Sequence, residues 1–330
     1  MKVLDVIIPA YNCRATLPRA LASIMTQVLA SQIQVIVVDD KSDETYEDII
    51  DSFKPYLDIQ LIHLSENVGP GGARQAGLDA ATDEWVTFMD ADDTFSHPFT
   101  LNSLLNNLVL KQMDVGVGEF AEELSDGRLV RHEHNFTWMF GKIYRRAFLE
   151  QYQIRFNNTR ANEDAGFNTI VSCCTDKIYF HNDIVYNWHY KATSITRIND
   201  HAYTYDKGLE GYFYNMKWAM LEALKKNIPE EIGDFQRKIT ERMFIMYFYY
   251  VNMGAQHPEM LVKYWEWIRP YYLEVYKPYQ DKITPEKFKI GYQSAIHSVG
   301  EQVSNAEPYK LTFYSFLDLL NKETFQEGDK

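Results

Sequence analysis

Cysteine, long apolar runs and excess positive charge are all scarce in this chain. The 330 residues include three cysteines, of which Cys173 and Cys174 are adjacent, and this spacing fits neither a disulfide framework nor a zinc site. The nearest candidate for a membrane span, residues 243–251, is far shorter than the roughly 20 apolar residues that cross a bilayer. Residues 1–5 include an acid and lack a signal-peptide cleavage pattern. These absences predict a cytoplasmic protein without a transmembrane segment.

Acidic residues outnumber basic ones, 46 to 33, which gives a formal net charge of −13. Such a charge disfavours an extended nucleic-acid surface, because lysine and arginine supply most contacts to phosphate. Hydrophobic residues make up 46% of the chain, enough to bury one large core or two smaller ones. We expect two parts, because the residue pattern changes near residue 200.

The first half of the chain alternates short apolar segments with segments of helical pattern. This order predicts an α/β fold with a largely parallel sheet and helices on its faces. The segment 67–72, which contains three glycines, is expected to be a loop. The strands are expected at residues 3–9, 34–38, 59–64 and 85–90, and the helices at residues 15–29, 45–53 and 73–81.

A polar or glycine-rich cluster follows each expected strand. The clusters are residues 9–12, 39–40, 67–72 and 90–93, in the order of the four strands. Ligands of parallel α/β sheets bind at the carboxyl ends of the strands, whereas ordinary surface turns would be scattered over both ends. The clusters therefore predict one ligand site.

Individual residues of these clusters suit a nucleotide. Asp40 can accept a hydrogen bond from the N–H of a base, and Tyr11 offers a face for stacking. The glycines would let the backbone approach a ligand, and Arg74 can pair with phosphate or with an acid of residues 90–93. The glycine segment matches neither a P-loop nor a dinucleotide fingerprint. A nucleotide with a metal-bridged diphosphate therefore fits better than ATP or NAD.

The sequence Asp-Ala-Asp-Asp at residues 90–93 has two interpretations. It can be a solvated turn or the N-cap of a helix. Alternatively, three carboxylates near a sheet edge become tolerable when a divalent cation neutralises part of their charge. The other clusters along the same edge favour the metal site.

Taken together, these segments resemble the family 2 glycosyltransferases of the GT-A fold. The matching segments follow the family's order and spacing over about the first 195 residues, although Gln75 stands where the family often has asparagine and the third segment has an extra Pro-Gly-Gly. The resemblance implies a Rossmann-like GT-A catalytic domain at residues 1–200, an inverting reaction and a nucleotide-sugar donor, commonly a UDP-sugar. The segments that carry it are Val6–Asn12, Val37–Ser42, Asn67–Arg74 and Asp90–Asp93.

The resemblance also implies roles for residues at the strand ends. Asp92, as the last acid of the Asp-x-Asp motif, is expected to bind Mn²⁺ or Mg²⁺, and Asp90 is expected to contact the ribose. The other implied nucleotide contacts are Pro9, Tyr11, Asp40, Asn67 and Arg74.

Glu163 and Asp164 precede an apolar helical stretch at residues 167–173. Acids at such a position can begin a helix, where they interact favourably with the macrodipole. The pair also resembles the family's Glu-Asp motif, whose aspartate is the catalytic base. An inverting displacement needs a carboxylate that takes the proton of the acceptor hydroxyl, so Asp164 is the expected base; the helix-start interpretation is compatible with this role.

Two short strands are expected at residues 177–180 and 184–186, followed by Trp188-His189-Tyr190. A histidine among aromatic residues can be structural, but the family often has a basic or metal-binding residue here. The resemblance thus makes His189 a candidate second metal ligand. Arg197, further along, is a candidate contact to the diphosphate.

Residues 201–330 show helical patterns with aromatic residues at three- and four-residue intervals, which predicts a mainly helical C-terminal domain. These aromatic residues can form a core, an acceptor platform on which sugar rings stack, or a self-association interface. The sequence does not separate the three.

The expected function is metal-dependent transfer of a sugar from a UDP-sugar to a hydroxyl of a glycan, a wall polymer or a lipid-linked acceptor. A phage-type enzyme that modifies hydroxylated bases of DNA is an alternative. A metal-dependent nucleotidyltransferase is a further alternative, but it would need a more basic triphosphate loop. A non-catalytic sugar-nucleotide-binding protein would leave Glu163 and Asp164 unexplained.

Overall fold

The computed structural model describes residues 2–192, 208–300, 311–326 and 329. The chain divides into two compact units, the first formed by residues 1–171 and 175–199 and the second by residues 172–174 and 200–330. The expected domains, 1–200 and 201–330, differ from this division mainly at residues 172–174. Among the described helices, none is both long and apolar enough to cross a membrane.

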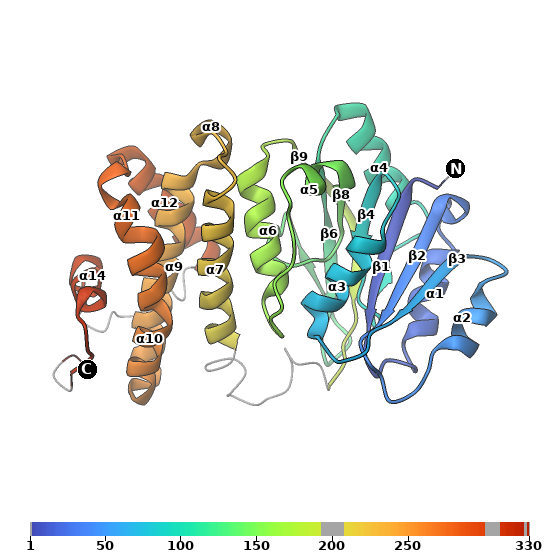
Figure 1. Cartoon of the computed structure of the whole chain (residues 1–330), viewed down its shortest axis with the longest axis horizontal. Coiled ribbons are helices and arrows are strands. Elements are labelled where there is room, and N and C mark those ends of the chain that lie inside the picture. The colour runs from blue at the N-terminus through green and yellow to red at the C-terminus, as the bar shows by residue number, and fades with distance from the viewer. Residues whose placement is uncertain (1, 193–207, 301–310, 327–328, 330) are drawn as a thin grey trace. The chain divides into compact units, whose positions relative to one another are not determined.

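In the described part of the first unit, nine strands form a mixed sheet with the order β3-β2-β1-β4-β8-β6-β9-β5, and β7 pairs with β6 (Figure 1). Its elements are β1 (Leu4–Ala10), α1 (Leu17–Met25), β2 (Ile33–Asp39), α2 (Glu47–Phe53), β3 (Asp58–His63), α3 (Gly69–Ala80), β4 (Trp85–Phe88), β5 (Thr94–Phe95), α4 (Thr100–Lys111), β6 (Val115–Glu123), β7 (Leu129–His132), β8 (Lys142–Arg145), α5 (Arg146–Gln151), α6 (Glu163–Cys174) and β9 (Ile178–Trp188).

The four predicted strands are present and pair in parallel, β3 with β2, β2 with β1 and β1 with β4. The rest of the sheet is mixed, because β8 is antiparallel to both β4 and β6, whereas β9 is parallel to β6. The prediction of a largely parallel sheet therefore holds for the first half of the unit only. The parallel half brings the carboxyl ends of β1, β2, β3 and β4 to one edge.

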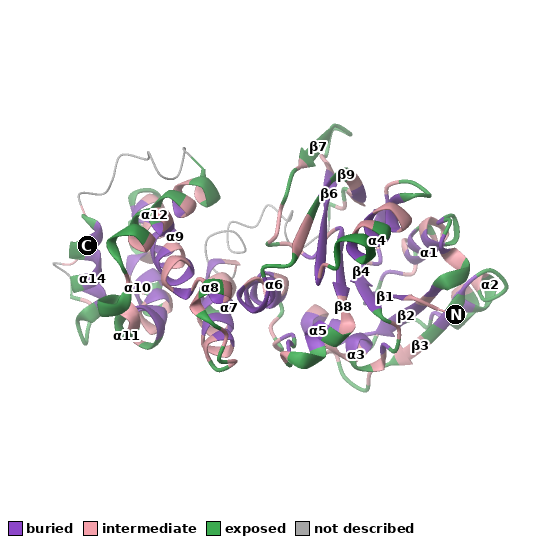
Figure 2. Cartoon of the chain, turned by 90° about the horizontal axis from the view of Figure 1, so that it is seen from above, coloured by how far each residue is buried: buried purple, intermediate pink, exposed green. Residues whose placement is uncertain are grey.

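Helices cover both faces of the parallel half (Figure 2). Leu4, Val6 and Ile8 of β1 belong to one buried cluster with the apolar side of α1. On the opposite face α3 approaches so closely that a Cβ on Gly77 would lie 2.4 Å from Cγ2 of Ile7. Since alternate residues of a strand face opposite sides, coverage of both faces explains why β1 is an uninterrupted apolar run.

Two local predictions are wrong. Residues 69–72 are not a loop but the first turn of α3, which begins at Gly69. Residues 177–180 and 184–186 do not form two strands, because β9 runs through both. Its pairing with β6 shifts register between Gly118 and Phe120, which accommodates the residues between the two expected strands.

The second unit is helical, as predicted. Many of its aromatic side chains are buried, and the ring of Phe244 stacks on that of Phe313 with centroids 3.9 Å apart. These rings form the core of the unit, which fits the first of the three interpretations. The described helices are α7 (Gly208–Leu224), α8 (Glu230–Gly233), α9 (Phe235–Gln256), α10 (Leu261–Tyr271), α11 (Lys277–Tyr279), α12 (Pro285–Val299) and α14 (Phe313–Asn321), with a π-helical turn at Tyr272–Tyr276.

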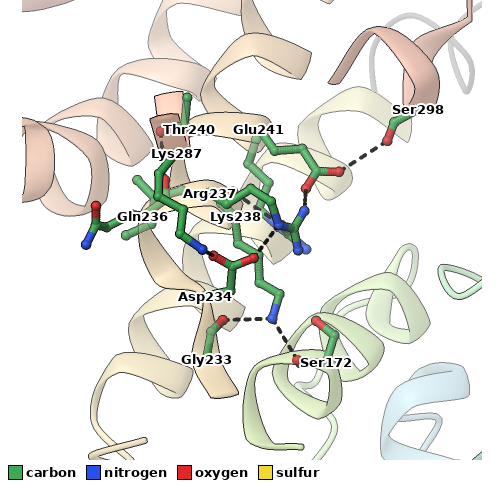
Figure 3. Close-up of polar contacts among 12 residues, drawn as sticks. Ser172, Gly233, Asp234, Gln236, Arg237, Lys238, Thr240, Glu241, Lys287 and Ser298 are labelled. Atoms are coloured by element: carbon green, nitrogen blue, oxygen red, sulfur yellow. Dashed lines mark hydrogen bonds and ion pairs between the residues drawn. The ribbon is translucent and has the colours of Figure 1, made fainter. Parts of the chain in front are cut away.

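Ion pairs join α9 and α12 within this unit (Figure 3). Asp234, which has a left-handed backbone conformation just before α9, accepts hydrogen bonds from Lys287 and Arg237. The Lys238 ammonium donates to the carbonyl oxygens of Gly233 and Ser172, at 2.7 Å each. The two bonds of Lys238 give partners to carbonyl oxygens in the last turns of α6 and α8.

Candidate active site

Asp40 lies at the end of β2, where its carboxylate binds the start of α3. Its two oxygens accept hydrogen bonds from the backbone N–H groups of Val68, at 2.7 Å, and Gly69, at 2.8 Å. Burial raises the pKa of Asp40, and these two donors oppose the rise. The residue expected to contact the base therefore also caps a helix.

The glycines of the first turn of α3 permit close packing against the segment that leads into α6. A Cβ on Gly71 would lie 2.5 Å from the carbonyl oxygen of Asn157 and 3.1 Å from Cβ of Glu163. Gly69 has a φ of +82°, a conformation that favours glycine. In this structure the glycines let protein approach protein, whereas the sequence suggested an approach to a ligand.

The acidic residues after β4 form a turn, in which the N–H of Asp93 donates to the carbonyl of Asp90. The side chains of Asp90 and Asp92 are partly exposed, whereas Asp93 is buried. The Asp93 carboxylate accepts from the Tyr186 hydroxyl and from the His189 N–H, both at 2.8 Å. The turn interpretation is thus right for the backbone, and Asp93 connects the turn to β9.

Arg74, on α3, lies between two of the acids. Its Nη2 donates to Oδ1 of Asp90 at 2.6 Å, and its Nη1 donates to Oε1 of Glu163. Burial lowers the pKa of Arg74, but the carboxylates of Asp90, Glu163 and Asp164 outweigh this effect and raise it. Of the two pairings predicted for Arg74, the structure contains the one with an acid.

Glu163 and Asp164 begin α6, as the helix-start interpretation predicts. Burial raises the pKa of Glu163 to about 7, and Arg74 opposes the rise. Burial also raises the pKa of Asp164, again opposed by Arg74 and by a hydrogen bond from the Ala165 N–H. Raised carboxyl pKa values at a buried site are characteristic of general bases.

Lys142, at the start of β8, is a buried cation that the sequence gave no reason to select. Its ammonium donates to the carbonyl oxygens of Asn135, at 2.9 Å, and of Trp138. Burial lowers the pKa of Lys142 to about 7, and Asp164 opposes this shift. Asn168, one turn after Asp164 on α6, also donates to the Trp138 carbonyl. The segment before β8 is therefore fixed beside the expected base.

Asp92 is paired with protein cations. Oδ2 of Asp92 lies 3.0 Å from the Lys191 ammonium, and the Asp92 carbonyl accepts a hydrogen bond from Arg19. Within residues 2–192, 208–300 and 311–326, no three His, Cys, Asp or Glu side chains are grouped so as to hold a metal ion. A partly exposed carboxylate still fits Mn²⁺ or Mg²⁺, which commonly take one or two protein carboxylates and complete their ligands with substrate phosphates.

His189 uses both ring nitrogens in the structure. Nε2 lies 2.9 Å from the Thr94 hydroxyl, and Nδ1 lies 3.0 Å from Oε2 of Glu123. An imidazole needs a free nitrogen to coordinate a metal, so His189 would have to lose one of these hydrogen bonds first. Its backbone, through the N–H bond to Asp93, is already tied to the acidic turn.

The remaining predicted contacts lie along the same edge. Pro9 is partly exposed at the end of β1, and the side chain of Tyr11, which follows this strand, is 53% exposed. The side-chain amide of Asn67 donates to the Asp40 carbonyl at 3.0 Å, and its oxygen accepts from Arg160. Arg197 lies outside the described residues.

The structure also brings in residues that were not predicted for the site, namely Lys142, Tyr186 and Lys191. Tyr186 and Lys191 contact acids of the site from distant points of the sequence, whereas Lys142 binds the segment just before it and belongs to no motif that the sequence analysis selected. Lys191, for example, lies 99 residues after its partner Asp92.

The sequence of this chain is similar to those of known proteins. The model of glycosyl transferase family 2 matches residues 5–163. The succinoglycan biosynthesis protein ExoO of Rhizobium meliloti (strain 1021) is 30% identical over 226 residues, which cover 60% of this chain and 64% of ExoO. The poly(ribitol-phosphate) beta-N-acetylglucosaminyltransferase TarS of Staphylococcus aureus (strain Mu50) is 26% identical over 249 residues, which cover 71% of this chain and 43% of TarS.

Solved structures share the fold. TarS 1–349 of S. aureus in complex with UDP-GlcNAc superposes with a TM-score of 0.70 at 20% identity, over 94% of each chain. The mannosyltransferase PcManGT of Pyrobaculum calidifontis in complex with GDP-Man and Mn²⁺ superposes with a TM-score of 0.52 at 14% identity, over 96% of this chain and 84% of PcManGT.

The fold of the first unit is thus of the GT-A class, as predicted. Residues 5–163 form a glycosyl transferase family 2 domain. The matched part of the chain covers 64% of ExoO and 43% of full-length TarS. Family membership favours the glycosyltransferase prediction over the nucleotidyltransferase alternative.

Proposed function

We propose that this chain transfers a sugar from a UDP-sugar to a hydroxyl group of a glycan or wall polymer, with inversion at the anomeric carbon. The observation that carries the proposal is the meeting of Asp90, Arg74 and the Glu163-Asp164 pair at the carboxyl edge of the parallel strands. This arrangement places one acid where the donor is proposed to bind and two acids where the acceptor is proposed to bind. The match to glycosyl transferase family 2 gives the class of reaction, sugar transfer.

The nucleotide is assigned to the edge formed by β1, β2 and α3. The backbones of Asp40 and Ala10 are adjacent, since the Asp40 N–H donates to the Ala10 carbonyl at 2.8 Å, and Tyr11 follows Ala10 with an exposed ring. An acceptor carboxylate next to a free aromatic face suits the N–H and the flat surface of a uracil. Support for UDP comes from TarS, which was solved in complex with UDP-GlcNAc.

Asp92 would hold the divalent cation, with the donor diphosphate providing further oxygen ligands. When bound, Mn²⁺ or Mg²⁺ would neutralise the charge that grows on the leaving diphosphate. Lys191 would release the Asp92 carboxylate and supply a second positive charge near it. His189 would become a ligand only by giving up its bond to Glu123 or Thr94.

Asp164 would take the proton of the acceptor hydroxyl as its oxygen attacks the anomeric carbon. Its raised pKa is closer to the working pH than the pKa of an exposed aspartate, and this favours proton transfer. Lys142 and Asn168 would keep the neighbouring segment, residues 135–140, in place around this base.

The acceptor is the least constrained part. ExoO is named for succinoglycan biosynthesis and TarS for transfer to poly(ribitol-phosphate). We therefore propose an extracellular polysaccharide or a wall polymer as the acceptor class. No observation favours modified DNA bases.

The test is a screen of the purified full chain against UDP-sugars with Mn²⁺, which measures UDP release with and without polymer acceptors. Asp164→Asn should lower transfer by about 10³-fold or more while the affinity for UDP stays close to that of the wild type. Asp79→Asn is a matched control, because Asp79 is an exposed aspartate on α3, and its activity should be unchanged. Wild-type transfer by Asp164→Asn would remove Asp164 from its role, and absence of turnover with every UDP-sugar would contradict the donor assignment.

A further inference from the structure

The two ends of the Arg74 guanidinium contact acids from different parts of the site. Asp90 belongs to the turn after β4, where the donor is proposed to bind, and Glu163 begins α6 beside the proposed base. The side chains of Arg74 and Glu163 are 6% and 7% exposed, whereas that of Asp90 is 31% exposed. Thus one buried cation connects the donor side of the site to its acceptor side.

A diphosphate has little access to this guanidinium. Nη1 and Nη2 are both engaged by carboxylates, and Nε is buried and has no hydrogen-bond partner among the residues that the structure describes. A phosphate would have to displace either the partly exposed carboxylate of Asp90 or the carboxylate of Glu163, which is buried and whose loss of its partner would be strongly unfavourable. This geometry argues against the nucleotide contact that the resemblance implied for Arg74.

The guanidinium of Arg74, which bridges Asp90 and Glu163, can hold these two acids in fixed positions. The planar guanidinium offers donors in a fixed fork, so two carboxylates bound at its two ends are held at a defined separation and orientation. The backbone adds to this constraint, since Gly71 lies against the segment before Glu163 with no room for a Cβ. Arg74 and Glu163 are therefore fixed relative to each other by main-chain packing and by the ion pair.

We propose that Arg74 is a positioning residue that joins the donor-side acid Asp90 to the acceptor-side pair Glu163-Asp164, and that it does not bind the diphosphate. This inference rests on the proposed function. Through the bridge, the turn that carries Asp90 and Asp92 and the start of α6 that carries Asp164 keep one relative geometry. The distance between leaving group and attacking hydroxyl is then set by the protein before the substrates bind.

Arg74 has a second effect, on charge. The charged and titratable groups that face Asp164 are Arg74 from α3, Asp90 after β4, Lys142 and Tyr144 from β8, and the neighbouring Glu163. Burial raises the pKa of both Glu163 and Asp164, and Arg74 is the strongest opposing influence on each. Loss of its charge should raise both further, so that Asp164 would become an ionised base only at higher pH.

Two substitutions separate position from charge, and a third serves as control. Arg74→Met removes both, whereas Arg74→Lys keeps the charge but cannot bridge two carboxylates with a planar fork. Arg145→Lys disturbs a comparable ion pair, between Arg145 and Asp114, at the opposite end of the strands. Each full-length variant is assayed for UDP binding by calorimetry with Mn²⁺, for kcat and KM with UDP-GlcNAc as donor probe, and for the pH dependence of kcat.

The inference predicts different results for the three variants. In Arg74→Met the acid limb of the kcat profile should move up by about one to three pH units, because a cation at this distance lowers carboxylate pKa values by that much. In Arg74→Lys the limb should stay near that of the wild type while kcat falls about tenfold from lost alignment. The UDP dissociation constant should stay within about threefold of the wild type in both, and Arg145→Lys should leave all three quantities unchanged.

Carbon-13 NMR of the Glu163 carboxyl group gives a readout that needs no turnover. Its titration should move to higher pH in Arg74→Met, and Arg74→Lys provides the comparison if the methionine variant does not fold. A large loss of UDP affinity with an unshifted pH profile would show that Arg74 binds the nucleotide and would overturn the inference. In Arg74→Met, a loss of kcat that is equal at every pH would overturn it too. Wild-type transfer by Asp164→Asn would instead refute the proposed function, with UDP binding and the Glu163 titration still reporting on Arg74.

Discussion

Tyr186 offers a sharp test of how the acidic turn is held. Tyr186 lies near the C-terminal end of β9, and its hydroxyl donates to Oδ2 of Asp93 at 2.8 Å and accepts from the N–H of Asp90 at 3.0 Å. The ring is buried between Phe140, with centroids 5.0 Å apart, and Phe95. Tyr186→Phe keeps the ring and removes both hydrogen bonds, so the change isolates the polar contribution.

The cost follows from the two bonds. A hydrogen bond to a carboxylate contributes about 1.5–3 kcal/mol and one to a neutral group about 0.5–1.5 kcal/mol, so the loss should be about 2–4 kcal/mol. Because the broken contacts are local, the N–H of Asp90 should exchange with solvent about 30-fold faster or more, as expected for a loss of about 2 kcal/mol. Hydrogen exchange measured by NMR on the full chain reports this amide directly.

A matched variant controls for the substitution itself. Tyr56→Phe changes a side chain that is 67% exposed, and it should leave both stability and exchange unaltered. An Asp90 amide in Tyr186→Phe that exchanges within about twofold of the wild-type rate would refute the reasoning, because the hydroxyl would then contribute nothing to the turn.

Three further changes test other parts of the site. In Gly71→Ala the new methyl would lie 2.5 Å from a backbone oxygen, so thermal unfolding should show a loss of about 1–3 kcal/mol together with reduced turnover; a stable and fully active variant would contradict the packing argument. Lys191→Ala should free the carboxylate of Asp92 and tighten Mn²⁺ binding in the absence of nucleotide about two- to fivefold, measured by electron paramagnetic resonance; weaker binding would show that Lys191 assists the metal. Asp40→Ala should cost about 2–4 kcal/mol in urea unfolding, because two helix N–H groups lose their acceptor, and Asp40→Asn should cost less; equal losses would count against the cap.

Local pattern sufficed for the parallel half of the catalytic unit. The strands β1, β2 and β4 are buried on both faces and consist mainly of apolar residues, and helical segments with a 3.6-residue period separate the strands. The edge that collects Asp40, Asn67 and the acidic turn follows from the parallel order alone. For this reason most of the candidate site could be placed before any coordinates were known.

The rest depended on contacts between distant residues. Gly69 to Gly72 have low intrinsic helix propensity, but the Asp40 carboxylate caps them and close packing against residues 157–163 holds them in a helix. The continuity of β9 depends on its partner β6, which lies more than 50 residues earlier. In both cases the contacting residues are far away in the sequence, so a short sequence segment does not reveal them.

The choice of partner for Arg74 shows the same limit. From the sequence, Arg74 was expected to pair with a phosphate or with an acid. In the structure it pairs with acids, one of which is Glu163, 89 residues away. The spacing of residues along the sequence does not show that Arg74 is buried. In the fold, solvent is excluded from its guanidinium, which already has two carboxylate acceptors.

The helix α3 connects the proposed base contact, Asp40, to the proposed positioning residue, Arg74. Its first N–H groups are held by Asp40, and Arg74 follows five residues after Gly69, about 7.5 Å along the axis at 1.5 Å per residue. A change at Asp40 that accommodates a different base would displace the start of the helix and, with it, the arginine. Nucleotide preference and catalytic rate should therefore be hard to alter separately, and redesign of the donor specificity of this protein would have to preserve the position of α3 while it reshapes the contact to the base.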